Sequence, residues 1–297
     1  MNREHKIYQV TLAGSIVNFL LVVFKFFAGI VGRSSAMIAD AVHSLSDFVS
    51  DIVVLLFVRI SGKPQDADHD YGHGKYETLA AVVIGLMLGV VGFGIMYNGA
   101  TAIYDAYAHG LMPAMPNYWA LSAAALSIFL KEAMYWYTIV WGRKLDSAAL
   151  RANAWHHRSD AFTSVATLIG IGGAMALGER WRILDPLAAV VVSVFIIVAA
   201  YRLMKPGIDE LLEKSLGDAE KRQITEILTQ TPGVVRIHRL CTRRIGTRAA
   251  IEVHLKMDAN LRLKDAHDIA SEAERRLRAA FGPQTHISIH MEPVDRP

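Results

Sequence analysis

Ionisable residues recur along one side of a strongly apolar segment near the N-terminus. The stretch DAVHSLSDFVSD, residues 40–51, lies between the apolar runs MIA and IVVLLFV. A helix turns by 100° per residue, so it places four of these side chains in one narrow stripe: Asp40, His43, Asp47 and Asp51. Ionisable side chains on an apolar helix are expected either to pair with other polar groups or to have a functional role.

Two histidine–aspartate pairs have the spacing of a metal site. His43 and Asp47 are four residues apart, and NAWHHRSDAF repeats that spacing with His156 and Asp160. If the two helices meet, two imidazole nitrogens and two carboxylate oxygens converge, a set that suits tetrahedral Zn²⁺. Hydrogen-bonded pairs that steady a helix bundle are the alternative. Because charges are costly inside a bilayer, the repeated pair favours a functional site.

A second candidate cluster follows in the stretch DADHDYGHGKYE, residues 66–77. Asp66, His69 and His73 are three and four residues apart, and Gly72 and Gly74 loosen the backbone around the last of them. The three side chains could chelate a second metal ion. They could equally belong to a solvated polar loop, and the spacing leaves both interpretations open.

The C-terminal part predicts a hairpin that pairs two histidines. VVRIHRLCTRR and RAAIEVHLKM alternate as strands around the turn residues IGT. A hairpin closed on Gly246 places His238 opposite His254. In the final stretch HISIHMEP, alternation turns His290 and Glu292 to the outer face and the apolar residues to the core: Ile287, Ile289 and Met291. These outer histidines could be metal ligands or plain surface residues.

Helical patterns flank the hairpin and complete a small α+β region. Residues 218–230 and 264–281 are predicted helices, and the second turns four residues inward: Ile269, Ala273, Leu277 and Ala280. The element order α-β-β-α-β predicts a small sandwich of the metallochaperone or ferredoxin-like kind. The single cysteine, Cys241, excludes an intrachain disulfide and any zinc site made of several cysteines.

The rest of the chain is typical of a polytopic membrane protein. Of its 297 residues 53% are hydrophobic, and the mean hydropathy is +0.28. About 20 apolar residues cross a bilayer as a helix, and six segments qualify: roughly 8–31, 35–59, 78–104, 118–141, 150–177 and 183–204. Residues 207–297 carry about half of all charged residues, so Pro206-Gly207 predicts a boundary between a membrane domain, 1–206, and a soluble domain, 207–297.

Charge placement predicts the orientation and excludes one class of partner. Lysine and arginine residues gather at the N-terminus, in the second and fourth loops and in the tail, so both termini are predicted to be cytoplasmic. The net charge is only +3, and acidic and basic residues are mixed in the tail, so nothing indicates nucleic-acid binding. Three charged residues lie inside predicted spans without an assigned role: Lys25, Lys131 and Glu132. A Lys25–Glu132 ion pair would relieve two of them.

Taken together, the six spans, the HSLSD and HHRSD pairs, the GHGKYE loop and the histidine-bearing tail resemble the cation diffusion facilitators. The similarity covers residues 8–293 and is greatest to the bacterial zinc and ferrous-iron efflux branch. It implies a homodimer in the inner (plasma) membrane that exports divalent metal in exchange for protons, with a transport site formed by His43, Asp47, His156 and Asp160. Several bacterial relatives have aspartate at the position of His43, whereas zinc-selective animal transporters also carry two His/Asp pairs. That difference favours Zn²⁺ over Cd²⁺ and argues against a simple transfer of iron activity.

The resemblance also gives the remaining histidines their implied places. It implies a loop site at Asp66, His69 and His73, and a binuclear site in the tail with five ligands: His238, His254, His267, His290 and Glu292. Lys75 and Glu213 match an expected salt bridge between membrane domain and tail at the dimer interface. Four histidines remain as surface or packing residues: His5, His109, His157 and His286.

An alternating-access cycle follows as a hypothesis. Zn²⁺ needs deprotonated ligands, so metal binding displaces protons, and protonation of His43 and His156 expels the metal. Asp51 and Asp40 would attract cations at the inner and outer mouths, although Asp40 could instead hydrogen-bond within the bundle. Trp155 is a candidate apolar gate, with packing as its alternative role. Tail metals could regulate transport or merely hold the dimer.

The sequence is also compatible with other functions. The main metal could be Fe²⁺, Mn²⁺ or Cd²⁺ in place of Zn²⁺. An intramembrane metal-dependent hydrolase would need an open coordination position beside an acid or base, and the sequence has no HExxH motif. The protein could also be a membrane-anchored metal sensor, but that function would not explain the two histidine–aspartate pairs within the predicted spans. No organic cofactor is indicated.

Overall fold

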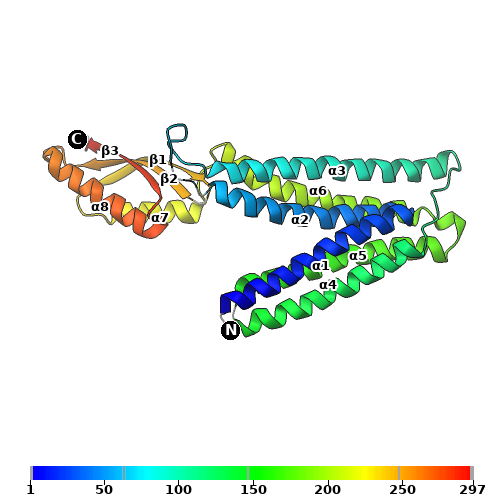
Figure 1. The fold of residues 1–297 in the computed structure, drawn as a ribbon. Helices are drawn as coiled ribbons and strands as arrows, with labels where there is room; N and C mark the ends of the chain where they lie inside the picture. The colour runs from blue at the N-terminus through cyan, green and yellow to red at the C-terminus, as the bar shows by residue number, and fades with distance from the viewer. Residues whose placement is uncertain (1–2, 62, 64, 146, 247, 295–297) are drawn as a thin grey trace. The chain divides into compact units, whose positions relative to one another are not determined.

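Six long helices precede a small α+β region in the chain (Figure 1). The computed structural model describes residues 3–61, 63, 65–145, 147–246 and 248–294, without the side chains of residues 3–8, 47, 50–61, 148, 149 and 152. The helices are α1 (Arg3–Val31), α2 (Ser35–Ser61), α3 (Lys75–Ala108), α4 (Tyr118–Lys144), α5 (Ala148–Ala176) and α6 (Leu184–Leu211). All six apolar segments predicted from the sequence are therefore helical.

Only some of these helices are long and apolar enough in their described residues to be candidate membrane spans. Among the described residues, three stretches are long and apolar enough to cross a bilayer: Gln9–Val31, Lys75–Ala108 and Glu179–Leu211. The expectation of six spans is thus not confirmed. Charged residues explain the difference in the described parts of the other helices, because Asp40 in α2, Lys131 in α4 and Asp160 in α5 interrupt the apolar runs.

The chain divides into two compact units that differ from the predicted division at residue 206. One unit contains Met1–Ile52 with Ile84–Arg202, and the other contains Val53–Val83 with Leu203–Pro297. Helix α6 continues through Pro206 to Leu211, so the Pro206-Gly207 pair does not end it. A division of the protein at residues 206–207 stays a prediction.

Small residues allow close helix packing in the first unit. Helices α1, α4 and α5 lie side by side, and a second group of contacts joins α2, α3 and α6 (Figure 1). A Cβ atom at Gly170 of α5 would lie 2.3 Å from the Cβ of Ala188 in α6. Helices in membranes use such small residues to bring their backbones together. The same packing brings α1, α2, α4 and α5 close enough to share buried polar side chains.

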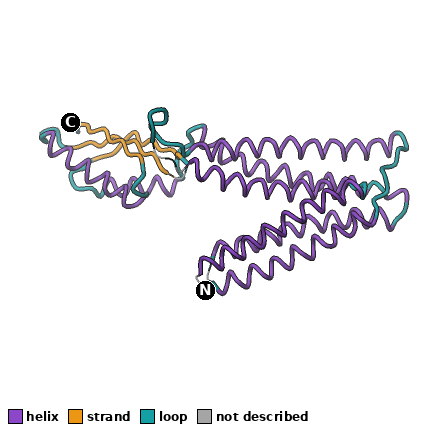
Figure 2. The backbone as a smooth tube through the Cα atoms, in the orientation of Figure 1, coloured by secondary structure: helices purple, strands orange, loops and turns teal. Residues whose placement is uncertain are grey.

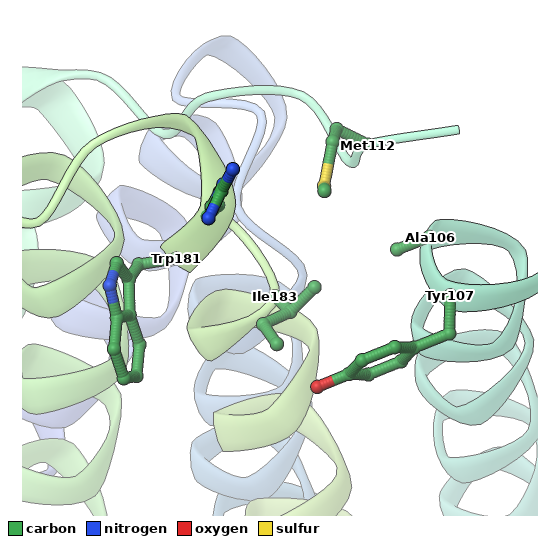
Figure 3. Close-up of a pocket in the computed structure, with 6 residues that line it drawn as sticks. Ala106, Tyr107, Met112, Trp181 and Ile183 are labelled. Atoms are coloured by element: carbon green, nitrogen blue, oxygen red, sulfur yellow. The ribbon is translucent and has the colours of Figure 1, made fainter. Parts of the chain in front are cut away.

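A cavity of about 480 Å³ opens at the C-terminal end of α3 and the N-terminal end of α6, beside the 3₁₀ helix η1 (Glu179–Trp181) (Figure 3). Its described lining consists of Ala106, Tyr107, Met112, Arg180, Trp181 and Ile183. These residues offer no carboxylate or imidazole, so this cavity does not have the chemistry of a metal site.

The second unit contains a three-stranded mixed sheet with two helices (Figure 2). This α+β region consists of α7 (Asp218–Thr229), β1 (Arg236–Ile245), β2 (Arg248–Met257), α8 (Leu263–Phe281) and β3 (His286–Pro293), and the same unit also contains one end each of α2, α3 and α6. Strand β2 is central; it pairs antiparallel with β1 and parallel with β3. The predicted order α-β-β-α-β is confirmed.

One face of the sheet and the two helices form the core of this region. Ile251, Val253 and Leu255 of β2 are at most 1% exposed and pack with residues of α7 and α8. Ile287, Ile289 and Met291 of β3 pack against the same cluster, as predicted. Ala273 and Leu277 are buried and Ile269 is partly so, but Ala280 is exposed, so its predicted inward position is wrong. Ala280 lies in the last turn of α8, where the larger side chain of Phe281 contacts the core instead.

Truncation of Leu277 to alanine is expected to destabilise this region by about 2–5 kcal/mol, because a fully buried leucine leaves a cavity. Amide hydrogen exchange of the full chain should show weaker protection of β2 and α8. Leu263→Ala in the same helix is the control, since its side chain is 79% exposed. Equal loss of protection in both variants would contradict the assigned core.

Candidate metal sites

Helix α5 buries a carboxylate beside an exposed imidazole. Asp160 is 3% exposed, and its Oδ1 lies 3.8 Å from Nδ1 of His156. His43 of α2 is half-buried, and its Nδ1 is shielded from solvent without a hydrogen-bond partner in the described part of the chain. Ligand atoms of His43, His156 and Asp160 do not all lie within 4.8 Å of one another. The side chains of Asp47 and Asp51 lie outside the described residues, so the predicted four-ligand set stays a prediction.

Two lysines neutralise the buried carboxylates of this region. Lys131 Nζ of α4 lies 2.6 Å from Asp160 Oδ2, and Lys25 Nζ of α1 lies 2.8 Å from Asp40 Oδ2. Glu132 pairs instead with Arg158, at 3.4 Å. The hypothetical Lys25–Glu132 pair is therefore wrong. Residue type alone could not choose between these partners, because the choice depends on which helix faces touch.

A hydroxyl network surrounds the Lys25–Asp40 pair. Lys25 donates to the hydroxyls of Ser44 and Ser164, and Ser164 donates to both Asp40 oxygens, at 2.9 and 3.2 Å. Lys25 and Asp40 are both 0% exposed. A neutralised and fully buried carboxylate favours the hydrogen-bonding role of Asp40 over an electrostatic funnel at an outer mouth.

Trp155 and His157, the neighbours of His156, have contrasting surroundings. Trp155 is 58% exposed and contacts the ring of Tyr135 edge-on, with centroids 5.6 Å apart. Its role as a gate stays a prediction. His157, expected at the surface or in packing, is 1% exposed, and neither ring nitrogen has a hydrogen-bond partner among the described residues. Gly14 of α1 lies against this ring. No sequence signal distinguished this histidine beyond its position 100° round the helix from His156.

The predicted loop cluster does come together. Asp66 Oδ1 lies 3.2 Å from His69 Nδ1, and Asp66 Oδ2 lies 3.3 Å from His73 Nε2. One ligand atom from each residue lies within 4.8 Å of the others. His73 is buried, and the centroids of its ring and that of His69 are 4.2 Å apart. Desolvation acts to raise the pKa of Asp66, but hydrogen bonds led by that of His69 hold it below its usual value. Two imidazoles and one carboxylate suit Zn²⁺ with one further ligand.

Glycines fix this loop against the turn of the β1–β2 hairpin. A Cβ atom at Gly74 would lie 2.8 Å from the carbonyl oxygen of Ile245, and one at Gly246 would lie 2.9 Å from the carbonyl oxygen of Gly74. An ion pair joins Lys75 to Glu213 within the one chain. Glu213 also contacts Arg243, with Nε–Oε2 at 2.8 Å. Backbone contact and charge together hold His73 beside Asp66.

Replacing Gly74 with alanine is expected to weaken zinc binding at the loop by roughly ten-fold, because the added methyl group displaces the backbone next to His73 and overpacking costs about 1–3 kcal/mol. Isothermal titration of the full chain would measure this. Gly217→Ala is the matched control, since its Cβ would meet only a side-chain oxygen at 3.6 Å and its φ is −63°. Unchanged loop affinity in Gly74→Ala would contradict the assigned contact.

The tail cluster brings three of the five predicted ligands together. Glu292 binds both imidazoles, with Oε2 2.7 Å from His238 Nε2 and Oε1 2.6 Å from His254 Nδ1. His290 is exposed, and its Nε2 lies 3.7 Å from Glu292 Oε1. His267 lies exposed on α8 and does not belong to the converging group. Within one chain, therefore, the set is His238, His254 and Glu292, with His290 beside it.

A β-bulge produces the predicted pairing of His238 with His254. The ladder near the turn pairs Ile245 with Arg248, a register that without interruption would place His238 opposite Leu255. The register shifts by one residue between His238 and Cys241, where Arg239 has φ +51°. An extra residue of this kind is characteristic of a bulge. The prediction centred the turn on Gly246 and so reached the correct pair without the bulge.

The tail carboxylate is held ionised by its neighbours. Hydrogen bonds to His254 and His238 lower the pKa of Glu292 to about 2. The group is therefore an anion throughout the physiological pH range and is ready to bind a cation. Two imidazoles and a carboxylate form a donor set that fits Zn²⁺.

Both parts of the chain match known cation efflux proteins. The family model of the cation efflux transmembrane domain matches residues 11–212, and that of the cation efflux protein cytoplasmic domain matches residues 216–294. The chain is a transporter and not an enzyme: a multi-pass membrane protein with a cytoplasmic domain at its C-terminal end. It belongs to the cation diffusion facilitator family, whose members move divalent metals and whose cytoplasmic domain binds metals and supports homodimerisation.

Two relatives match nearly the whole chain, and one solved structure matches its cytoplasmic part. The manganese efflux system protein MneP of Bacillus subtilis is 34% identical over 295 residues, which cover 98% of this chain and 97% of that protein. The cation-efflux pump FieF of Citrobacter koseri is 30% identical, with 96% and 92% covered. A crystal structure of the cytosolic domain of a cation diffusion facilitator family protein is 27% identical over 26% of this chain and 90% of its own, with a TM-score of 0.24.

Proposed function

We propose that this transporter exports Zn²⁺ from the cytoplasm in exchange for protons, by alternating access through six membrane-spanning helices. The observation that supports it most directly is the buried Asp160 carboxylate of α5, which faces His156 from the same helix inside the cation efflux domain. Nitrogen and carboxylate ligands together are typical of zinc sites.

The proposed transport site consists of His43, Asp47, His156 and Asp160. Metal binding requires neutral imidazoles and ionised carboxylates, so protons arriving from the outer side compete with the bound metal and release it. Asp51 at the inner mouth and Trp155 as a gate complete the proposed route. Asp40, paired with Lys25, stabilises the helices beside it.

The other two clusters are proposed as resident zinc sites in the cytoplasm. The loop site consists of Asp66, His69 and His73, and the two carboxylate oxygens each face one imidazole. The tail site consists of His238, His254 and Glu292 with His290 alongside, and His267 is proposed to join it in the homodimer. Zinc bound at the tail site would stabilise one arrangement of the tail. Separately, the Lys75–Glu213 ion pair connects the end of the loop to the residues that follow α6.

Manganese is the second candidate substrate, because the relative MneP bears that metal in its name and matches nearly the entire chain. Mn²⁺ prefers oxygen ligands, whereas His43 and His156 supply nitrogen. The proposed membrane is the inner (plasma) membrane, with both chain ends in the cytoplasm and the domain division at residues 206–207.

Proteoliposomes loaded with a metal-sensitive dye and subjected to a pH gradient test the proposal. Zn²⁺ is expected to enter faster than Mn²⁺, Fe²⁺ or Cd²⁺, and only when the gradient is present. Zinc flux that is independent of the gradient would contradict proton exchange, and faster Mn²⁺ flux would favour the second candidate.

The variant His43→Asp is expected to shift the Cd²⁺/Zn²⁺ rate ratio towards Cd²⁺ by roughly ten-fold, because an oxygen ligand replaces an imidazole and loosens the zinc preference. The same vesicle assay measures both ions side by side. His109→Asp, in an exposed pair with Asp105 outside the proposed site, is the control. An unchanged ratio in His43→Asp would remove His43 from the transport site.

A further inference from the structure

The amino group of Lys131 lies directly against a carboxylate of the proposed transport site. Its side chain is 2% exposed, and its Nζ lies 2.6 Å from Asp160 Oδ2. In the part of the chain that the structure describes, Asp160 is its only hydrogen-bonding partner. Lys25 is held differently, because its ammonium group contacts Asp40, Ser44 and Ser164 together.

Asp160 is divided between a cation and a candidate ligand. One of its oxygens binds the ammonium group of Lys131, and the other faces the imidazole of His156 at 3.8 Å. A metal ion bound between Asp160 and His156 would lie within a few ångströms of Lys131 Nζ. Like charges at that separation repel strongly where water is excluded. The ammonium group and a metal ion are therefore competitors for one carboxylate.

We propose that Lys131 is a tethered counter-cation of the transport site, which neutralises Asp160 when no metal is bound and which an incoming divalent ion must displace. The inference rests on the proposed function, because it needs Asp160 to be a transport ligand. It makes Lys131 a specificity-determining residue and not a metal ligand.

The displacement step selects for charge. A monovalent ion such as Na⁺ or K⁺ brings no more charge to Asp160 than the ammonium group already supplies. A divalent ion brings twice that charge and also binds imidazole nitrogen, which an alkali ion binds poorly. Lys131 thus favours divalent over monovalent cations, and its return to Asp160 promotes release of the metal on the other side.

A purely structural ion pair between α4 and α5 is the competing explanation. The neighbouring ion pair Glu132–Arg158 joins the same two helices. Glu132 follows Lys131 directly in α4, Arg158 lies two residues before Asp160 in α5, and both side chains are about one-third exposed. It provides a matched control: Glu132→Gln breaks an α4–α5 ion pair without touching Asp160. A structural role would make the two losses similar, whereas displacement concerns Lys131 alone.

Zinc affinity of the full-length protein in nanodiscs at one fixed pH tests the proposal. The parent carries Asp66→Ala, His254→Ala and Glu292→Ala, so that only the transport site remains. Lys131→Gln is expected to tighten zinc binding at least roughly ten-fold, within the usual range of coupling between two sites, and to increase competition by Na⁺. Lys131→Arg and Glu132→Gln should keep the parent's affinity. Equal affinity in Lys131→Gln and the parent would overturn the proposal.

A measurement on unsubstituted Lys131 covers the case in which Lys131→Gln does not fold. Solid-state NMR of protein with ¹⁵N-labelled lysine and ¹³C-labelled aspartate should show the Lys131–Asp160 contact without metal and lose it with saturating Zn²⁺, with Lys131→Arg assigning the signal. Persistence of the contact under zinc would refute displacement. Zinc binding by the parent that Asp160→Asn leaves unchanged would instead refute the proposed transport site.

Discussion

Zinc transport by Asp160→Asn is expected to fall by at least about 100-fold, since even the outer partners of metal ligands contribute 10–100-fold to affinity. Asp160 is the buried carboxylate of the proposed site, and an amide oxygen cannot replace its charge. Flux of Zn²⁺ into dye-loaded proteoliposomes measures the effect. Zinc binding by the tail should remain, because His238, His254 and Glu292 are untouched.

Loss of folding must be separated from loss of a ligand in this experiment. Asp160→Asn leaves the ammonium group of Lys131 buried without its ion pair, and breaking such a pair costs about 3–5 kcal/mol. The double variant Lys131→Gln with Asp160→Asn removes both charges and should recover thermal stability without recovering transport. If transport returned together with stability, Asp160 would be a structural residue only.

Glu292→Ala is expected to weaken zinc binding by the tail about 100-fold or more. Its carboxylate contacts both histidines at 2.6 and 2.7 Å, so its removal takes away one ligand and the group that orients the other two. Isothermal titration in the Asp66→Ala background would isolate this site from the loop. Zinc flux is measured with the same variant in proteoliposomes, and a flux that is reduced but not abolished would identify the tail site as regulatory.

His286→Ala on the same strand is the matched control for this variant. His286 faces the ring of Tyr71 with centroids 5.1 Å apart, and it does not belong to the converging group. Its replacement should leave tail affinity unchanged. If both variants lost the same affinity, the cluster around Glu292 would not be the binding site.

Periodicity made most of the fold predictable. Apolar runs long enough for helices predicted α1–α6, and alternation predicted the three strands with their inner and outer faces. The loop cluster was predictable for a local reason: Asp66, His69 and His73 lie within eight residues of one another, so one short loop can bring them together. The tail pair His238–His254 was predicted from a turn centred on Gly246, but the observed pair depends on the bulge at Arg239, which the alternation of the sequence does not indicate.

Contacts between distant helices were not predictable in the same way. Spacing along the chain indicated that His156 and Asp160 share a face, but nothing in the sequence assigned Lys131 to Asp160 or Lys25 to Asp40. Those choices depend on the rotation and crossing of α1, α2, α4 and α5, which the packing of small residues determines. The burial of His157 had the same cause.

The bulge in β1 has a consequence for how the hairpin can vary among related proteins. Arg239 is the surplus residue between His238 and Cys241, it is exposed, and it does not belong to the converging group of His238, His254 and Glu292. Deletion of this one residue would restore an uninterrupted ladder while His238 still faced His254. A natural homologue one residue shorter at this point would therefore retain the pairing of the two histidines, so the length of this strand can vary without separating them.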